Sequence, residues 1–182
     1  MKIIPSEESK KLTKVAKRLE KELNVTIKIK EKEVNIEGNP EDEYIAGQVV
    51  EAVLFGFPIE AALLIKAEEY LFEILNIKDY THRKDLESIR ARVIGSEGRT
   101  LRTLNQLTDC YFELKGNEVG IIGAPESIKT ANDALIMVVQ GSKQANVYTF
   151  LEKHHTEPIL DLGLKEMKKE KRAKKSAKKV KE

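Results

Sequence analysis

The sequence predicts an α+β fold made of two tandem copies of one small unit, followed by a basic segment. Three observations predict it. A Gly-x-x-Gly turn at 95–98 separates two helical patterns. A strand, a turn, a second strand and a third helical pattern follow over 110–139. The strand and Gly-x-Pro-Glu junction at 119–126 has a counterpart 85 residues earlier, at 34–41.

The first copy, placed at 1–67, is expected to keep the scaffold and to lack the glycine turn. Its expected elements are a strand Lys2–Ile4, a helix from Ser6 to about Leu23, strands Val25–Lys30 and Glu33–Glu37, a helix Glu41–Phe55 and a helix Ile59–Lys66 after Pro58. At the offset of 85, Lys10–Thr13 stand opposite the turn and contain no glycine. The apolar positions predict one uninterrupted amphipathic face through Leu23. This copy would then pack against the second copy or bind a protein, while its lysines would contact phosphates or form a solvated face.

The second copy, placed at 68–164, carries the glycine turn. Its expected elements are a strand Tyr70–Lys78, a helix that Thr81 caps and that runs through Val93, a leucine-lined helix over 101–107, strands over 110–114 and 119–122, and a helix over 125–139. The order is therefore helix, glycine turn, helix, strand, turn, strand and helix.

A Gly-x-x-Gly turn between two helices suits contact with a nucleic-acid backbone. Gly95 and Gly98 have no Cβ atoms, so a backbone can approach closely, and the amide N–H groups of the following helix are aimed at a phosphate. Alone, the pattern is equally that of a plain tight turn. In the element order above it is the arrangement of a type I KH module, which clamps about four nucleotides of single-stranded RNA.

Arginines gather near the turn, since five of the seven in the chain lie between 83 and 102. A guanidinium group suits phosphate oxygens and stacks on bases. The candidate RNA-binding arginines are Arg90, Arg92, Arg99 and Arg102. Asp85 and Glu87 on the same predicted helix are alternative partners for some of them, in surface ion pairs of little energy.

Charge is distributed unevenly along the chain. The formal net charge is +2, but residues 165–182 hold ten Lys or Arg against three Glu. This low-complexity segment is either a solvated, frayed helix or a non-specific RNA-binding extension. No apolar run of about 18 residues predicts a membrane span, and the N-terminus does not resemble a signal peptide. Cys110, the single cysteine, fits a reducing compartment, so we expect a cytoplasmic protein with Cys110 in its core rather than as a reactive thiol.

No pattern of catalytic or cofactor-binding residues is found in the sequence, so an enzyme is not expected, and neither is a cofactor or a bound metal. The chain has no phosphate-loop motif, no Cys-x-x-Cys and no nucleophile elbow. His154 and His155 lie near acidic residues, which leaves a metal site open. A helix C-terminus before Pro158 accounts for the pair more simply, because adjacent helical residues point in different directions and His is favoured there.

The chain resembles the Partner-of-Nob-One (Dim-Two) family, whose members have two tandem KH copies with the glycine turn only in the second. The resemblance covers about residues 1–160. It rests on Val-Ile-Gly-Ser-Glu-Gly-Arg-Thr at 93–100, Asn-Glu-Val-Gly-Ile-Ile-Gly-Ala at 117–124, and Gly-Ser at 141–142 followed by Val-Tyr at 147–148.

This resemblance implies an archaeal-type factor that binds single-stranded RNA near the 3′ end of small-subunit ribosomal RNA and assists its maturation. It implies the Nob-One endonuclease as a partner and, more weakly, the α subunit of translation initiation factor two. The family's RNA clamp carries over onto Gly95, Ser96, Glu97 and Gly98, and its groove onto Ile94, Arg99, Arg102, Leu114 and the neighbouring Lys115. Many KH loops have Lys between the glycines. In this chain, Glu97 stands there instead, which leaves three alternatives. Its carboxylate points away from the bound phosphate, it pairs with Arg99 or Arg102, or it weakens the binding of phosphate by the loop.

Two functions from different classes therefore remain. The first is an RNA-binding assembly factor. The second is a KH-fold scaffold for protein interactions that has little affinity for RNA.

Overall fold

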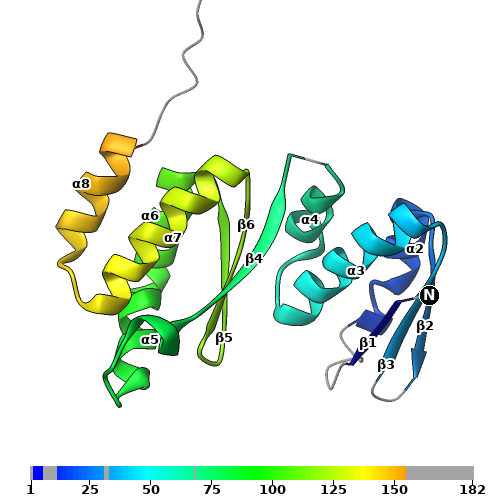
Figure 1. Cartoon of the computed structure of the whole chain (residues 1–182), viewed down its shortest axis with the longest axis horizontal. Coiled ribbons are helices and arrows are strands. Elements are labelled where there is room, and N and C mark those ends of the chain that lie inside the picture. Colours follow the sequence, from blue (N-terminus) through cyan, green and yellow to red (C-terminus); the bar gives the residue numbers. More distant parts are fainter. Residues whose placement is uncertain (1, 6–11, 31–32, 68, 155–182) are drawn as a thin grey trace, which may run out of the picture.

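The computed structural model describes residues 2–5, 12–30, 33–67 and 69–154, which form two halves side by side, each built of a sheet and helices (Figure 1). The first half contains β1 (Lys2–Pro5), α2 (Ala16–Leu23), β2 (Thr26–Lys30), β3 (Glu33–Glu37), α3 (Pro40–Phe55), α4 (Ile59–Ala62) and the 3₁₀ helix η1 (Leu63–Lys66). The second contains β4 (Leu71–Asn76), η2 (Ile77–Tyr80), α5 (Leu86–Ile94), η3 (Ser96–Gly98), α6 (Arg99–Thr108), β5 (Tyr111–Lys115), β6 (Glu118–Gly123), α7 (Pro125–Gln140) and α8 (Gln144–His154).

The two sheets have the same strand order, and their β2–β3 and β5–β6 pairs have the same register. Each is antiparallel and three-stranded, in the orders β1-β3-β2 and β4-β6-β5. Ile27 pairs with Ile36 in the first sheet, and Phe112 pairs with Ile121 in the second. Each residue of the second pair lies 85 residues after its counterpart in the first pair. The internal repeat thus extends to individual strand partners.

The long helices α3 and α7 begin and end in the same way. Each has a proline in its first turn, where the missing N–H costs nothing and the fixed φ suits a helix. Each ends at a glycine with positive φ, Gly56 at +141° and Gly141 at +100°. Apolar residues of α7, among them Leu135 and Val139, are fully buried against the second sheet and the helices beside it.

An apolar contact joins the two halves. Phe55 and Phe57 from the end of α3 meet Phe72 of β4, with ring centroids 5.8–6.1 Å apart. Gly120 of β6 makes room for them, since a Cβ there would lie 2.7 Å from the Phe57 ring and 2.9 Å from the Phe55 ring. Ile122 is fully buried in the same cluster as the core of the first half. The first half thus covers one face of the second sheet, while helices cover the other.

The expected elements are present with small shifts of their ends, and two expectations were wrong. The first long helix is not uninterrupted, because a turn at Lys14 and Val15 separates helical Leu12–Thr13 from α2. Residues 6–11 of that expected helix lie outside the described residues. Thr81 does not cap α5. The Asp85 carboxylate does so instead, accepting a hydrogen bond from the Ser88 N–H at 3.1 Å.

Candidate nucleic-acid interface

The glycine turn lies between α5 and α6 in a conformation that favours glycine. Gly95 has φ +74° and Gly98 has φ +73°, and the Gly98 N–H donates to the Gly95 carbonyl at 3.2 Å. Glu97 between them is also left-handed, at φ +55°. A Cβ built on Gly98 meets no atom within 4 Å, so this face of the turn is open to a ligand backbone.

Gly95 has a structural task that Gly98 does not have. A Cβ at Gly95 would overlap the hydroxyl of the buried residue Thr100 on α6. The Thr100 hydroxyl in turn accepts a hydrogen bond from the Gln144 side chain at 2.8 Å. Gln144, the first residue of α8, is therefore hydrogen-bonded to the residue that packs against Gly95 in the turn. Sequence reasoning missed Thr100 and Gln144, because they lie 44 residues apart and no local pattern links them.

The charged groups at the turn are mostly exposed. The guanidinium of Arg99 lies 3.6 Å from the Glu97 carboxylate, and the two side chains are 75% and 82% exposed. Among the three alternatives left open for Glu97, the structure thus contains the pair with Arg99. Arg102 is exposed one turn along α6, whereas Arg90 is half-buried on α5. An exposed pair of this kind is weak, so Arg99 remains able to meet a phosphate.

The guanidinium of Arg92 lies beside Gly141 and not at the glycine turn. A Cβ at Gly141 would lie 2.8 Å from Nη1 of Arg92 and 3.5 Å from Nη2 of Arg83, so both guanidinium groups face the C-terminal end of α7. The helix dipole places partial negative charge there, which suits a cation. Nη1 of Arg92 is buried and has no hydrogen-bond partner. The structure therefore separates Arg92 from Arg99 and Arg102 at the turn.

The apolar and basic groove residues are also separated. Ile94 is 37% exposed at the end of α5, immediately before the turn. Leu114 of β5 is half-buried and packs on the core of the second half. The Lys115 ammonium instead donates to the Leu54 carbonyl of the first half at 2.9 Å. Lys115 thus helps to join the halves, across 61 residues of sequence.

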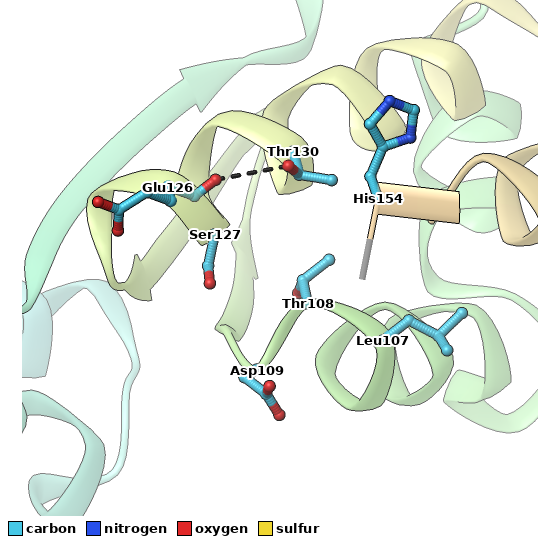
Figure 2. A pocket seen from close by; sticks show the side chains of 7 residues that line it. All are labelled: Leu107, Thr108, Asp109, Glu126, Ser127, Thr130 and His154. Atoms are coloured by element: carbon cyan, nitrogen blue, oxygen red, sulfur yellow. Dashed lines mark hydrogen bonds between the residues drawn. The ribbon is translucent and has the colours of Figure 1, made fainter. Parts of the chain in front are cut away.

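A small cavity of about 130 Å³ lies on one side of α6, where α6, α7 and α8 meet (Figure 2). Asp109, Glu126 and His154 contribute to its lining, but Figure 2 shows these three side chains pointing away from one another. The His154 Nδ1–H donates a 2.7 Å hydrogen bond to the Phe150 carbonyl, and the His154 ring packs on the Phe150 ring. These groups do not converge on one point. His155, which follows His154 in the sequence, lies outside the described residues.

Cys110 is a core residue. It is 2% exposed, and burial raises the pKa of its thiol to about 11. A thiol with that pKa stays protonated at neutral pH and is a poor nucleophile. Within the described part of the chain, no three His, Cys, Asp or Glu side chains are grouped as metal ligands, and no helix is long and apolar enough to cross a bilayer.

Comparison with known families identifies the second half. The model of the second KH domain of PNO1, described as a eukaryotic-type KH domain (KH-domain type I), matches residues 71–156. A KH domain-containing protein of Methanocaldococcus jannaschii is 34% identical over 146 residues, which are 76% of this chain and 64% of that relative. The RNA-binding protein pno1 of Drosophila melanogaster is 32% identical over 135 residues, 69% of this chain and 56% of the fly protein. The chain thus spans less than two thirds of the length of these relatives.

Solved structures agree with the fold. Dim2p of Pyrococcus horikoshii has a TM-score of 0.76 at 27% identity, covering 84% of this chain and 98% of that one. Dim2p from the same organism, crystallised in a complex described as a/eIF2alpha-aDim2p-rRNA, has a TM-score of 0.78 at 27% identity, with 86% and 94% covered. The chain therefore has the α+β, KH-type fold of these proteins.

Proposed function

Because the chain belongs to the PNO1 (Dim2) family, whose KH-domain model matches residues 71–156, we propose that it binds single-stranded RNA near the 3′ end of small-subunit ribosomal RNA and assists the maturation of that end. The observation that carries the proposal is the open face at Gly98. A phosphate reaching this point meets no side chain, and it faces the first amides of α6. The role implies the cytoplasmic location expected from the sequence.

The division of labour between the halves is part of this proposal. We take residues 1–67 as a KH-like domain without the glycine turn, 68–164 as the RNA-binding KH domain, and 165–182 as a basic extension. The shared strand order supports the first assignment. The expected clamp and groove residues that remain candidates for RNA contact in this arrangement are Ile94, Gly95, Ser96, Gly98, Arg99, Arg102, Arg90 and Leu114.

The proposed partners come from the relatives. One relative from Chaetomium thermophilum is named a pre-rRNA-processing protein. The Pyrococcus structure holds Dim2p together with the translation initiation factor two α subunit and ribosomal RNA. We propose ribosomal RNA and this α subunit as partners of the present chain on that basis. The Nob-One endonuclease is proposed from the family resemblance alone.

Binding of defined oligonucleotides tests the proposal. An RNA with the mature 3′ end of small-subunit ribosomal RNA should bind the full chain at least about tenfold tighter than a scrambled RNA, which corresponds to about 1.4 kcal/mol. Fluorescence anisotropy at physiological salt measures both. Equal binding of the two RNAs, with and without the endonuclease, would count against a role at the 3′ end. Crosslinking in cells, mapped on ribosomal RNA, locates the site independently.

The second candidate is the protein-interaction scaffold, and one observation favours it. Glu97 places an 82% exposed carboxylate inside the turn, where it repels phosphate. A scaffold of this kind would bind the initiation-factor α subunit and show little affinity for any RNA. Titration with the two oligonucleotides above separates the candidates, because the scaffold predicts weak and indistinguishable binding of both.

A further inference from the structure

A cavity of about 570 Å³ lies on the side of α6 that faces β5, within the usual range for small-molecule sites. Its lining residues are Tyr70, Asn105, Gln106, Asp109, Cys110 and Tyr111. It differs from the cavity of Figure 2, to which α6 contributes Leu107 and Thr108, although Asp109 lines both.

One lining residue of the cavity, Asn105, has an unpaired hydrogen-bond acceptor. Oδ1 of Asn105 is buried and has no hydrogen-bond partner. A buried acceptor without a donor is unfavourable, and a ligand N–H would relieve that cost. Asp109, exposed at the end of α6, adds a carboxylate. No Lys or Arg is among the lining residues, so the charge of the cavity disfavours a phosphate and suits a group that donates hydrogen bonds.

Two aromatic rings border the same space. Tyr111 at the start of β5 is 44% exposed, and Tyr70 before β4 is half-buried. An exposed ring next to unpaired polar groups is the usual arrangement for an unstacked base of single-stranded RNA, which stacks on the ring and bonds through its edge.

The cavity continues the surface that begins at the glycine turn. On a helix, residues three and four apart lie on one side. Gly98, Arg102 and Asn105 follow this spacing along α6, and Asp109 ends the row. The ten residues of α6 span about 15 Å. An RNA strand held at the turn and extended along this row would place its next base beside Asn105.

We propose that this cavity is an additional nucleobase subsite that reads the base adjoining the four held at the glycine turn. The subsite prefers adenine, cytosine or guanine over uracil. An exocyclic amino group has two N–H bonds, which serve the Asn105 oxygen and the Asp109 carboxylate together, whereas uracil has one N–H on its pairing edge. This inference rests on the proposed RNA-binding function and deepens it.

Oligonucleotides of increasing length test the subsite in the full chain. The best-binding four-nucleotide RNA is extended by one residue at its 5′ or its 3′ end, with each of the four bases in turn. One of the two extensions should tighten binding at least about fivefold with an amino-bearing base and about twofold or less with uracil. No gain from either extension, or equal gains from all four bases, would overturn the subsite. Absence of binding by the four-nucleotide RNA itself would instead overturn the proposed function.

Variants locate the effect at the cavity. Asn105→Leu, of similar volume, should abolish the preference among bases and leave binding of the four-nucleotide RNA unchanged. Tyr111→Leu should reduce the gain from the added base for all bases alike. Thr103→Ala, on another side of α6, is the matched control and should change neither. If Asn105→Leu fails to fold by circular dichroism, Tyr111→Leu alone still decides. A full gain retained with Tyr111→Leu would contradict the proposal.

Discussion

The two halves share a scaffold and differ at the turn between their first two helices. Leu19 and Leu104, 85 residues apart, are both fully buried. By the offset of 85, Leu12 of the first half corresponds to Glu97 of the second half; Leu12 is helical and fully buried, whereas Glu97 lies in the glycine turn and is 82% exposed. This position therefore belongs to the core in one half and to the surface in the other. The difference shows how one scaffold can carry a buried segment in one half and an exposed glycine turn in the other.

The charged side chains around the two turns follow the same division. In the first half, the Arg18 guanidinium donates to the Glu60 carboxylate at 2.9 Å, and a Glu20 oxygen accepts from the Ile27 amide at 2.8 Å. These polar groups are therefore hydrogen-bonded to groups of the same half. In the second half, Arg102 is exposed and Arg99 has only a 3.6 Å contact with Glu97. The second half thus keeps cations available to a ligand.

The largest expected effect lies in the first half. Leu12→Ala should lower the free energy of unfolding by about 2–5 kcal/mol, because it leaves a cavity in a fully buried position. Urea unfolding followed by circular dichroism measures it. The matched change Glu97→Ala in the second half should stay within about 0.5 kcal/mol. A loss below about 1 kcal/mol for Leu12→Ala would remove the contrast between the turns.

The next effect lies in RNA binding. Gly98→Asp should raise the Kd for single-stranded RNA at least about thirtyfold, or about 2 kcal/mol, because it adds a side chain and a negative charge at the open face. Asp tolerates the left-handed conformation, so the fold should persist. Thr13→Asp, at the corresponding exposed position of the first half, should change the Kd less than twofold. A similar loss of RNA affinity in both variants would mean that both halves bind RNA. Gly95 is unsuitable for this test because any side chain there overlaps Thr100.

The salt dependence of RNA binding distinguishes the arginines at the glycine turn from Arg92 and from the lysines of the first half. With about three phosphates neutralised, log K should fall with log salt at a slope near −2. Replacing Arg99 and Arg102 by Ala should reduce this slope by about 1.4, whereas Arg92→Ala should leave it unchanged, because that guanidinium faces the end of α7. Replacing Lys17 and Lys21 of the first half should also leave it unchanged. A flat response of the intact chain would favour the scaffold function.

The smallest effect concerns Glu97. Glu97→Gln removes a negative charge from the turn and frees Arg99, so RNA should bind about twofold tighter at low salt. Anisotropy titrations of the variant and of Glu22→Gln, an exposed change in the first half, provide the comparison. Weaker binding by Glu97→Gln would indicate that the carboxylate orients Arg99 productively.

Local patterns in the sequence predicted most of the fold, because the strands and helices are marked by alternation, prolines and glycines. β3 has the expected ends at Glu33 and Glu37. The turn at Lys14 and Val15 carries neither Gly nor Pro, so no local signal marked it. The glycine turn was predicted for the same local reasons. The hydrogen bond of Lys115 to Leu54 and the position of Arg92 beside Gly141 were not predicted, because these residues lie far apart in the chain.

The aromatic contact between the halves has a consequence for the entropy of binding. Phe55 and Phe57 occupy the space left by Gly120, so the halves meet across a packed apolar surface rather than through a loose tether. A ligand or partner that touches both halves finds them already oriented and loses little rotational freedom of one half against the other. Two domains on a flexible linker would pay that cost at each encounter. The preorganisation of the whole surface thus depends on a glycine outside the candidate RNA-binding site.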